Sequence, residues 1–358
     1  MTEIKNRRID YLDLARGICM ICIVLGHLGN DSINHVVFTF HLPVFYLITG
    51  FFHDPKAKVT DILKKRFRTL IIPYFFACIC IMISYLIINL GILHTDPASI
   101  KERILKFISA SIYAAGDSWD HPFIIPGIGA IWFLWATFWG SLILHLLLRI
   151  GPVKRTVIIF ALVFFAKWTV DKYLFLPLSI QPGCTAVIFM YAGYLWKENK
   201  ETIDKLPQSV KAVAGTAALV VWYEFIKNFK SFWLVHSYYG RGYIDIAGSL
   251  CASFAVISIC CYLDRYAGKF LKPLYSLGKY SIIALTAHII ELNTFPWGKI
   301  LNDLLGEGYS DRKALFVKIA IKLPWMFLVT FIFYKIRPVR FIFNIRTKSR
   351  SKAPVPDV

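Results

Sequence analysis

Charged residues are scarce in this sequence. Only 18% of the 358 residues are Asp, Glu, Lys or Arg, whereas 57% are hydrophobic and the mean hydropathy is +0.56. A water-soluble chain of this length needs more polar surface, so the composition excludes a pair of soluble domains. Repeated apolar runs of about twenty residues match the hydrocarbon thickness of a bilayer. Because these runs are continuously apolar and not alternating, they predict spanning helices and not a β-barrel.

Acidic residues are scarcer still, with 22 Asp and Glu against 41 Lys and Arg and a net charge of +19. In a soluble protein this excess would suggest nucleic acid, but here it follows the expected membrane topology. The connections on one side of the expected spans hold 26 Lys and Arg, and those on the other side hold 10. The positive-inside rule therefore predicts cytoplasmic termini, contacts with membrane lipids and no nucleic-acid partner.

A removable signal peptide and a disulfide framework are both absent from the sequence pattern. The N-terminal M-T-E-I-K-N-R-R is strongly charged and no small-residue cleavage site follows it, so we expect the first helix to remain as an anchor. The cysteines lie in or beside apolar segments and are expected to be packing residues and not a zinc or disulfide site. They are Cys19, Cys22, Cys78, Cys80, Cys184, Cys251, Cys260 and Cys261.

The apolar pattern predicts an all-α, polytopic membrane bundle of about ten spanning helices. They are expected near residues 12–30, 35–53, 69–93, 128–149, 155–171, 181–197, 208–226, 243–263, 273–292 and 314–336. We assign residues 1–340 to one membrane domain and 341–358 to a basic, disordered cytoplasmic tail. Within 94–127, the apolar spacing predicts an amphipathic helix at the membrane interface.

Two ionisable residues interrupt the first apolar segment. Arg16 precedes His27 by eleven residues, and at about 100° per residue both side chains fall on nearly the same face of a helix. At a rise of about 1.5 Å per residue, they differ in depth by about 16 Å. A second histidine, His41, begins the next segment. Because ionisable groups are costly within lipid, these residues indicate a functional site.

Each of these residues also has a structural explanation. Arg16 could mark the membrane border by snorkelling, or could pair with Asp10 or Asp13. The basic run containing Lys64, Lys65, Arg66 and Arg68 could bind anionic lipids or the phosphates of a cofactor. Trp132 could belong to an aromatic belt. His288 and Glu291 lie at the same expected depth as His27.

Taken together, five sequence blocks resemble acyltransferase family 3, in particular its fucose 4-O-acetylase-like branch. The blocks are the Arg16–His27 pair, F-H-L-P-V-F-Y-L-I-T-G, K-K-R-F-R-T-L-I-I-P-Y, I-W-F-L-W and S-L-G-K-Y-S before a helical histidine. The resemblance implies transfer of an acyl group, usually from acetyl-CoA, to a hydroxyl of a cell-envelope carbohydrate or lipid-linked sugar. It implies a multi-pass enzyme of the bacterial inner membrane and no metal.

The resemblance also assigns roles to residues. Arg16 and His27 match the arginine–histidine motif of the family, and His41 matches the histidine of its second helix. The paired cations before the third helix are matched either by Arg66 with Arg68 or by Lys65 with Arg68. We expect Arg16 and these cations to bind the phosphates of the donor. His27 is expected to act as a general base or as a transient acyl carrier. The acceptor is expected near Trp132, His288 and Glu291.

Two rival interpretations remain open on the sequence. The first is a transporter or flippase of a lipid-linked sugar, in which the histidines relay protons. The second is a metal site formed by His27, His41 and His288, whose imidazoles are suitable ligands.

Overall fold

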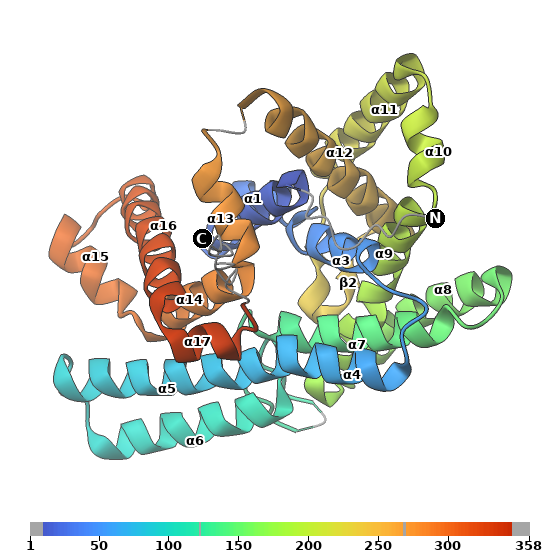
Figure 1. Ribbon diagram of the computed structural model, residues 1–358. Helices are drawn as coiled ribbons and strands as arrows, with labels where there is room; N and C mark the ends of the chain where they lie inside the picture. Colours follow the sequence, from blue (N-terminus) through green and yellow to red (C-terminus); the bar gives the residue numbers. More distant parts are fainter. Residues whose placement is uncertain (1–9, 122, 268–269, 346–358) are drawn as a thin grey trace, which may run out of the picture.

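The computed structural model describes residues 10–121, 123–267 and 270–345, and almost all of them are helical (Figure 1). The first half contains α1 (Asp10–Gly26), α2 (Asp31–Val37), α3 (His41–Phe51), α4 (Val59–Arg66), the π-helical turn η1 (Phe67–Ile71), α5 (Ile72–Gly91), α6 (Pro97–Tyr113), α7 (Trp132–Leu147) and α8 (Pro152–Asp171). The second half contains η2 (Pro177–Ser179), α9 (Ile180–Glu198), α10 (Lys200–Lys205), α11 (Gln208–Lys227), β1 (Phe232–Trp233), η3 (Leu234–His236), β2 (Tyr238–Tyr239), α12 (Tyr243–Ala267), α13 (Lys272–Lys279), α14 (Ser281–Thr294), α15 (Trp297–Leu305), α16 (Asp311–Lys335) and α17 (Arg337–Ile342).

The predicted fold class is confirmed, because the chain is an all-helical, polytopic membrane protein. Within the described residues, six helical segments are long and apolar enough to cross a bilayer, and α7 and α14 are shorter apolar helices. Each of the ten predicted spans coincides with at least one helix. All eight cysteines are free thiols; five are buried, whereas Cys261 is exposed.

Two predicted spans are broken and not continuous. The second is divided into α2 and α3 by a turn at 38–40, and the ninth is divided into α13 and α14 at Tyr280. At the first break, the Thr39 hydroxyl donates to the Val36 carbonyl at 2.6 Å, and the Thr39 carbonyl accepts a hydrogen bond from the Ser249 hydroxyl of α12 at 2.6 Å. Both breaks lie beside the cavity described below.

The helix predicted between 94 and 127 is present as α6. Asp96 caps its N-terminus by accepting a hydrogen bond from Ser99, and Pro97 occupies its first turn. α6 runs back alongside α5 in the opposite direction (Figure 1). The hydroxyl of Tyr74, which is in α5, donates to the Ser111 carbonyl at 2.8 Å. The hairpin therefore positions the loop after α6 beside the start of α7.

Pairs of glycines hold the helices that carry Arg16 and His41. A Cβ on Gly17 would lie 2.1 Å from the Leu274 carbonyl oxygen of α13, and one on Gly278 would lie 1.7 Å from the Asp13 carbonyl oxygen of α1. Close backbone approach of this kind needs small residues at helix interfaces in a membrane. Gly50 of α3 contacts α9 in the same manner, with a Met190 carbonyl oxygen 1.8 Å from the position of a Cβ.

Part of the expected C-terminal tail is folded. α17 extends to Ile342, and Phe343 and Ile345 line the cavity. The helical domain therefore reaches beyond the predicted boundary at residue 340. The remainder of the expected tail, residues 346–358, lies outside the described residues.

Candidate active site

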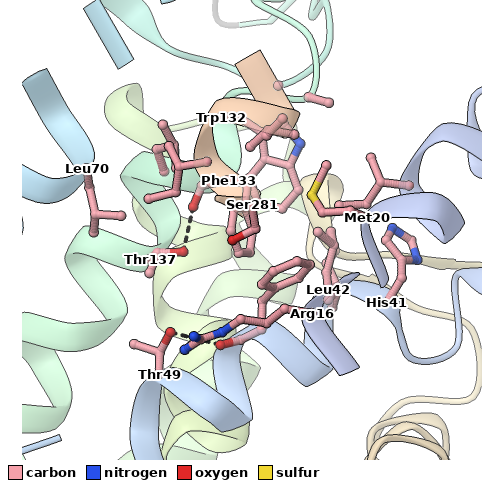
Figure 2. Close-up of a pocket in the computed structure, with 18 of the residues that line it drawn as sticks. Arg16, Met20, His41, Leu42, Thr49, Leu70, Trp132, Phe133, Thr137 and Ser281 are labelled. Atoms are coloured by element: carbon pink, nitrogen blue, oxygen red, sulfur yellow. Dashed lines mark hydrogen bonds between the residues drawn. The ribbon is translucent and has the colours of Figure 1, made fainter. Parts of the chain in front are cut away.

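One cavity of about 780 Å³ passes between the helices and is lined by both Arg16 and His27. Its volume lies within the usual range for small-molecule sites. The walls come from α1, α2, α3, α4, η1, α7, α13, α14, the 114–131 loop and the β1–η3 segment. Figure 2 shows Arg16 and Thr49 toward one end of this pocket and Trp132 toward the other. The two residues that the sequence predicted on one helical face therefore share one cavity.

The directions of α3 and α7 define the two ends of the cavity. The Arg16 guanidinium lies 5.8 Å from the centroid of Phe52, which directly follows α3. His41 begins α3 and therefore lies at the opposite end. α7 runs in the same direction as α3, because Phe45 packs on Phe133 near the start of α7 and His53 bonds His145 near its end. The start of α7 consequently lies at the His41 end. We call these the Arg16 end and the His27 end.

The Arg16 end is rich in cations. The Arg16 guanidinium pairs with Asp13 at 3.5 Å, and its side chain is 26% exposed. Lys65, Arg66 and Lys279 also line the cavity. The Nε atom of Arg66 is buried and has no hydrogen-bond partner among the described residues. A buried donor of this kind can be satisfied by an anionic ligand.

The basic run spans the end of α4 and the π-helical turn η1. Pro73 has no N–H and its ring crowds the carbonyl four residues earlier, so regular α-helical bonding cannot continue there. The helix widens over Phe67–Ile71, a distortion that is common at functional sites. Arg66 and Lys65 line the cavity, whereas Arg68 is exposed and lies 5.0 Å from the Phe341 ring of α17.

The His27 end carries three imidazoles. His27 follows the last residue of α1 and is accessible within the cavity. His41 lines the same cavity and its Nδ1–H donates to the Val37 carbonyl at 2.5 Å, which leaves Nε2 as the acceptor atom of the neutral ring. The ring of His288 lies 5.3 Å from the ring of His27, measured between centroids.

A buried ionic network supports His288 from behind. Glu291 accepts hydrogen bonds from His288 Nδ1 at 3.2 Å, from Trp297 Nε1 at 2.7 Å and from Lys322 Nζ at 2.5 Å. The side chains of Glu291 and His288 are 0% exposed and that of Lys322 is 2% exposed. Because Glu291 fixes the proton on Nδ1 of His288, the Nε2 atom is an acceptor in the neutral ring. That Nε2 is buried and has no partner among the described residues.

The predicted site residues therefore occupy different positions around the cavity. Arg16, His27, His41, Lys65, Arg66 and Trp132 line it. His288 and Glu291, which we expected to contact the acceptor, are buried behind His27 and are not lining residues, and neither is Arg68. The Arg16–Asp13 pair shows that one of the proposed structural partners of Arg16 is in contact with it.

Sequence reasoning missed several polar groups of the site. Lys322 is the cationic partner of Glu291, and its signal was a lysine inside an apolar span, four residues after Lys318. Asn34 lines the cavity from the short helix α2, and its Oδ1 is buried without a partner among the described residues. Asp117 and Trp233 enter from two loops. No signal in the sequence connected these loops.

The proposed three-histidine metal site is not supported by the geometry. Across the described parts of the chain, no group of three or more His, Cys, Asp and Glu side chains is arranged to hold a metal ion.

A comparison with known protein families identifies the family of the chain. A sequence model of an acyltransferase domain, that of acyltransferase family 3, matches residues 9–335. The chain belongs to acyltransferase family 3. No curated protein and no solved structure gave a significant match. Membership implies acyltransferase activity with an acyl donor, and it favours an enzyme over the rival transporter.

Proposed function

We propose that this family 3 acyltransferase is an O-acetyltransferase, which moves an acetyl group from acetyl-CoA to a hydroxyl of a cell-envelope carbohydrate or lipid-linked sugar. The observation that carries the proposal is the single cavity lined by a cationic group at one end and by His27 at the other. Acyl transfer needs a donor and an acceptor to meet at one base. A cavity with two chemically different ends satisfies this requirement.

The donor binds at the Arg16 end in this proposal. Coenzyme A carries its phosphates at one terminus and its thioester at the other. Arg16, Lys65 and Arg66 would neutralise the phosphates by charge-assisted hydrogen bonds, and the unpartnered Nε of Arg66 supports this role. The pantetheine arm would then extend along the cavity toward His27, over a helical rise of about 16 Å. Cytoplasmic termini in the bacterial inner membrane would give this end access to cytoplasmic acetyl-CoA.

His27 acts as the general base in the direct route. Its imidazole removes the proton from the acceptor hydroxyl as the oxygen attacks the thioester carbon. The tetrahedral intermediate then expels the thiolate of coenzyme A, and the imidazolium returns the proton to that sulfur. The products are the acetyl ester and free coenzyme A. In the alternative route, the imidazole of His27 attacks the thioester carbon and coenzyme A leaves as its thiol, taking the imidazole proton. The acceptor hydroxyl then attacks the acetyl-imidazole and gives its proton to His27, which restores the neutral ring.

His288, Glu291 and Lys322 act as positioning residues. The buried Glu291 carboxylate holds the His288 ring next to the ring of His27, and Lys322 balances its charge. His41 lines the cavity with a fixed tautomer and is available to orient the acceptor.

The proposal is tested with labelled acetyl-CoA. Membranes that contain the protein should transfer radiolabel from acetyl-CoA to an envelope saccharide fraction, and membranes without it should not. Mass analysis of envelope glycans from cells with and without the protein should show a gain of one acetyl group per modified unit. A gain in mass that matches another acyl group would mean that the donor is a different acyl-CoA. The absence of any transfer to carbohydrate would contradict the proposed function.

A further inference from the structure

An aromatic and acidic cluster lies at the His27 end, on the loop after α6 and on the β1–η3 segment. Its members are Asp117, Trp119, Trp233 and His236, and Asp117 and Trp233 line the cavity. These two segments meet at Gly116, where a Cβ would lie 2.2 Å from the Val235 side chain and 2.4 Å from the ring of Trp132. Because Trp132 begins α7, the cluster lies at the opposite end of the cavity from Arg16.

Trp233 presents one supported aromatic face. The ring of His236 stacks on it, with 5.4 Å between centroids and 23° between planes. His236 is fixed in turn, because its Nε2 donates to Asp117 Oδ2 at 3.1 Å and Trp119 contacts its ring edge-on at 4.8 Å. Trp233 nevertheless stays 46% exposed. One side of the indole is therefore held by protein, and the remainder is open.

The segment that carries Trp233 is anchored in the core. β1 pairs with β2 through Phe232 and Tyr239, whose side chains are buried. The Tyr239 hydroxyl shares a short hydrogen bond with Thr185 of α9, and Thr185 also donates to Ser237 at 3.2 Å. Trp233 therefore stands on a fixed support and loses little conformational freedom on binding a ligand.

The Asp117 carboxylate is the group in the cluster that can accept further hydrogen bonds. The hydrogen bond from His236 lowers the pKa of Asp117 below its ordinary value, so the group is ionised at neutral pH. Its side chain is 55% exposed, so lone pairs remain open to solvent besides those used by His236 and the Ser118 N–H. A carboxylate accepts hydroxyl donors strongly and repels phosphate.

We propose that Trp233 and Asp117 form the subsite that binds the acceptor as a neutral saccharide. The apolar face of a sugar ring packs on the open indole face of Trp233, and ring hydroxyls donate to Asp117. An amphipathic aromatic surface beside an ionised carboxylate matches a ligand that has both apolar C–H faces and hydroxyl groups that donate hydrogen bonds. The charge also separates the substrates, since the phosphates of the donor are favoured only at the Arg16 end. This inference rests on the proposed function and assigns residues to its acceptor.

The test measures saturation by acceptor and by donor separately. Purified full-length protein in lipid nanodiscs receives labelled acetyl-CoA and, as the probe, the envelope saccharide fraction from cells that lack the protein. We expect Trp233→Ala and Asp117→Asn each to raise the half-saturating saccharide concentration about tenfold or more. The half-saturating concentration of acetyl-CoA should stay at the parental value.

Matched variants separate binding from folding. Trp233→Phe keeps an aromatic face and should stay within about threefold of the parent. Trp168→Ala removes an indole of similar exposure, 50%, from α8. It should leave the half-saturating saccharide concentration at the parental value. An unchanged saccharide dependence in Asp117→Asn and Trp233→Ala would overturn the subsite, as would an equal loss of donor affinity. Absence of saccharide transfer in the parent protein would instead refute the proposed function.

Discussion

The two ends of one cavity differ in charge, in chemistry and in the way they are built. The Arg16 end gathers cations from helices, with Arg16, Lys65 and Arg66 supplied by α1 and α4. The His27 end combines imidazoles on helices with an aromatic and acidic cluster on loops. α1 and the turn after it connect the two ends, and the helical rise from Arg16 to His27 is about 16 Å. The contrast suggests that a rigid helix sets the distance over which the donor must reach, while the loops recognise the acceptor.

The largest expected effect is at the His27 end. His27→Ala should lower the rate of acetyl transfer by about 10² to 10⁴-fold, because the base or carrier is removed. Binding of acetyl-CoA, measured by calorimetry on purified protein, should change little because the cations are intact. His94→Asn alters an exposed histidine outside the cavity and should leave the rate unchanged. Parental rates in a normally inserted His27→Ala protein would exclude the catalytic assignment.

The second effect distinguishes positioning from stability. Glu291→Gln leaves the buried Lys322 cation without its counter-ion, which should destabilise the protein by about 3–5 kcal/mol. Adding Lys322→Met should recover most of the thermal stability, since the unpaired charge is removed. If Glu291 positions His288 and His27, the double variant should fold well and still transfer slowly. A double variant with both stability and activity restored would leave Glu291 with a structural role alone.

The third effect is confined to the Arg16 end. Arg66→Ala should raise the half-saturating acetyl-CoA concentration by about 10 to 100-fold, as expected for a lost charge-assisted bond of about 1.5–3 kcal/mol. Arg68 is the matched control, because it belongs to the same basic run but contacts Phe341 outside the cavity. Arg68→Ala should change donor saturation less than about threefold. A larger increase in the half-saturating acetyl-CoA concentration for Arg68→Ala than for Arg66→Ala would mean that the donor binds beside Arg68 and not beside Arg66.

The smallest effect concerns the helix that joins the two ends. Gly17→Ala places a Cβ against the Leu274 carbonyl and should cost about 1–3 kcal/mol of stability by forcing α1 away from α13. Gly215→Ala has open space around its Cβ position and is the control. A melting temperature for Gly17→Ala equal to that of Gly215→Ala would mean that α1 and α13 are not packed as described.

Only part of this difference between the two ends of the cavity could be predicted from the sequence. The spacing of Arg16 and His27 on an apolar helix fixed their shared face and their depth difference, because helical geometry is local. The link between Glu291 and Lys322 joins residues 31 positions apart, and that between Asp117 and His236 joins residues 119 apart. Tertiary packing sets such contacts, so periodicity cannot reveal them. Arg66 and Arg68 are two positions apart and therefore face different sides of any helix. The apolar pattern does not say which of the two faces the cavity.

The most direct measurement is a structure of the full-length protein in lipid with coenzyme A bound, by electron cryomicroscopy. Our account predicts the phosphates beside Arg16, Lys65 and Arg66, and the thiol end of the pantetheine directed along the cavity toward His27. Coenzyme A bound outside this cavity, or with its phosphates at the His27 end, would contradict the account.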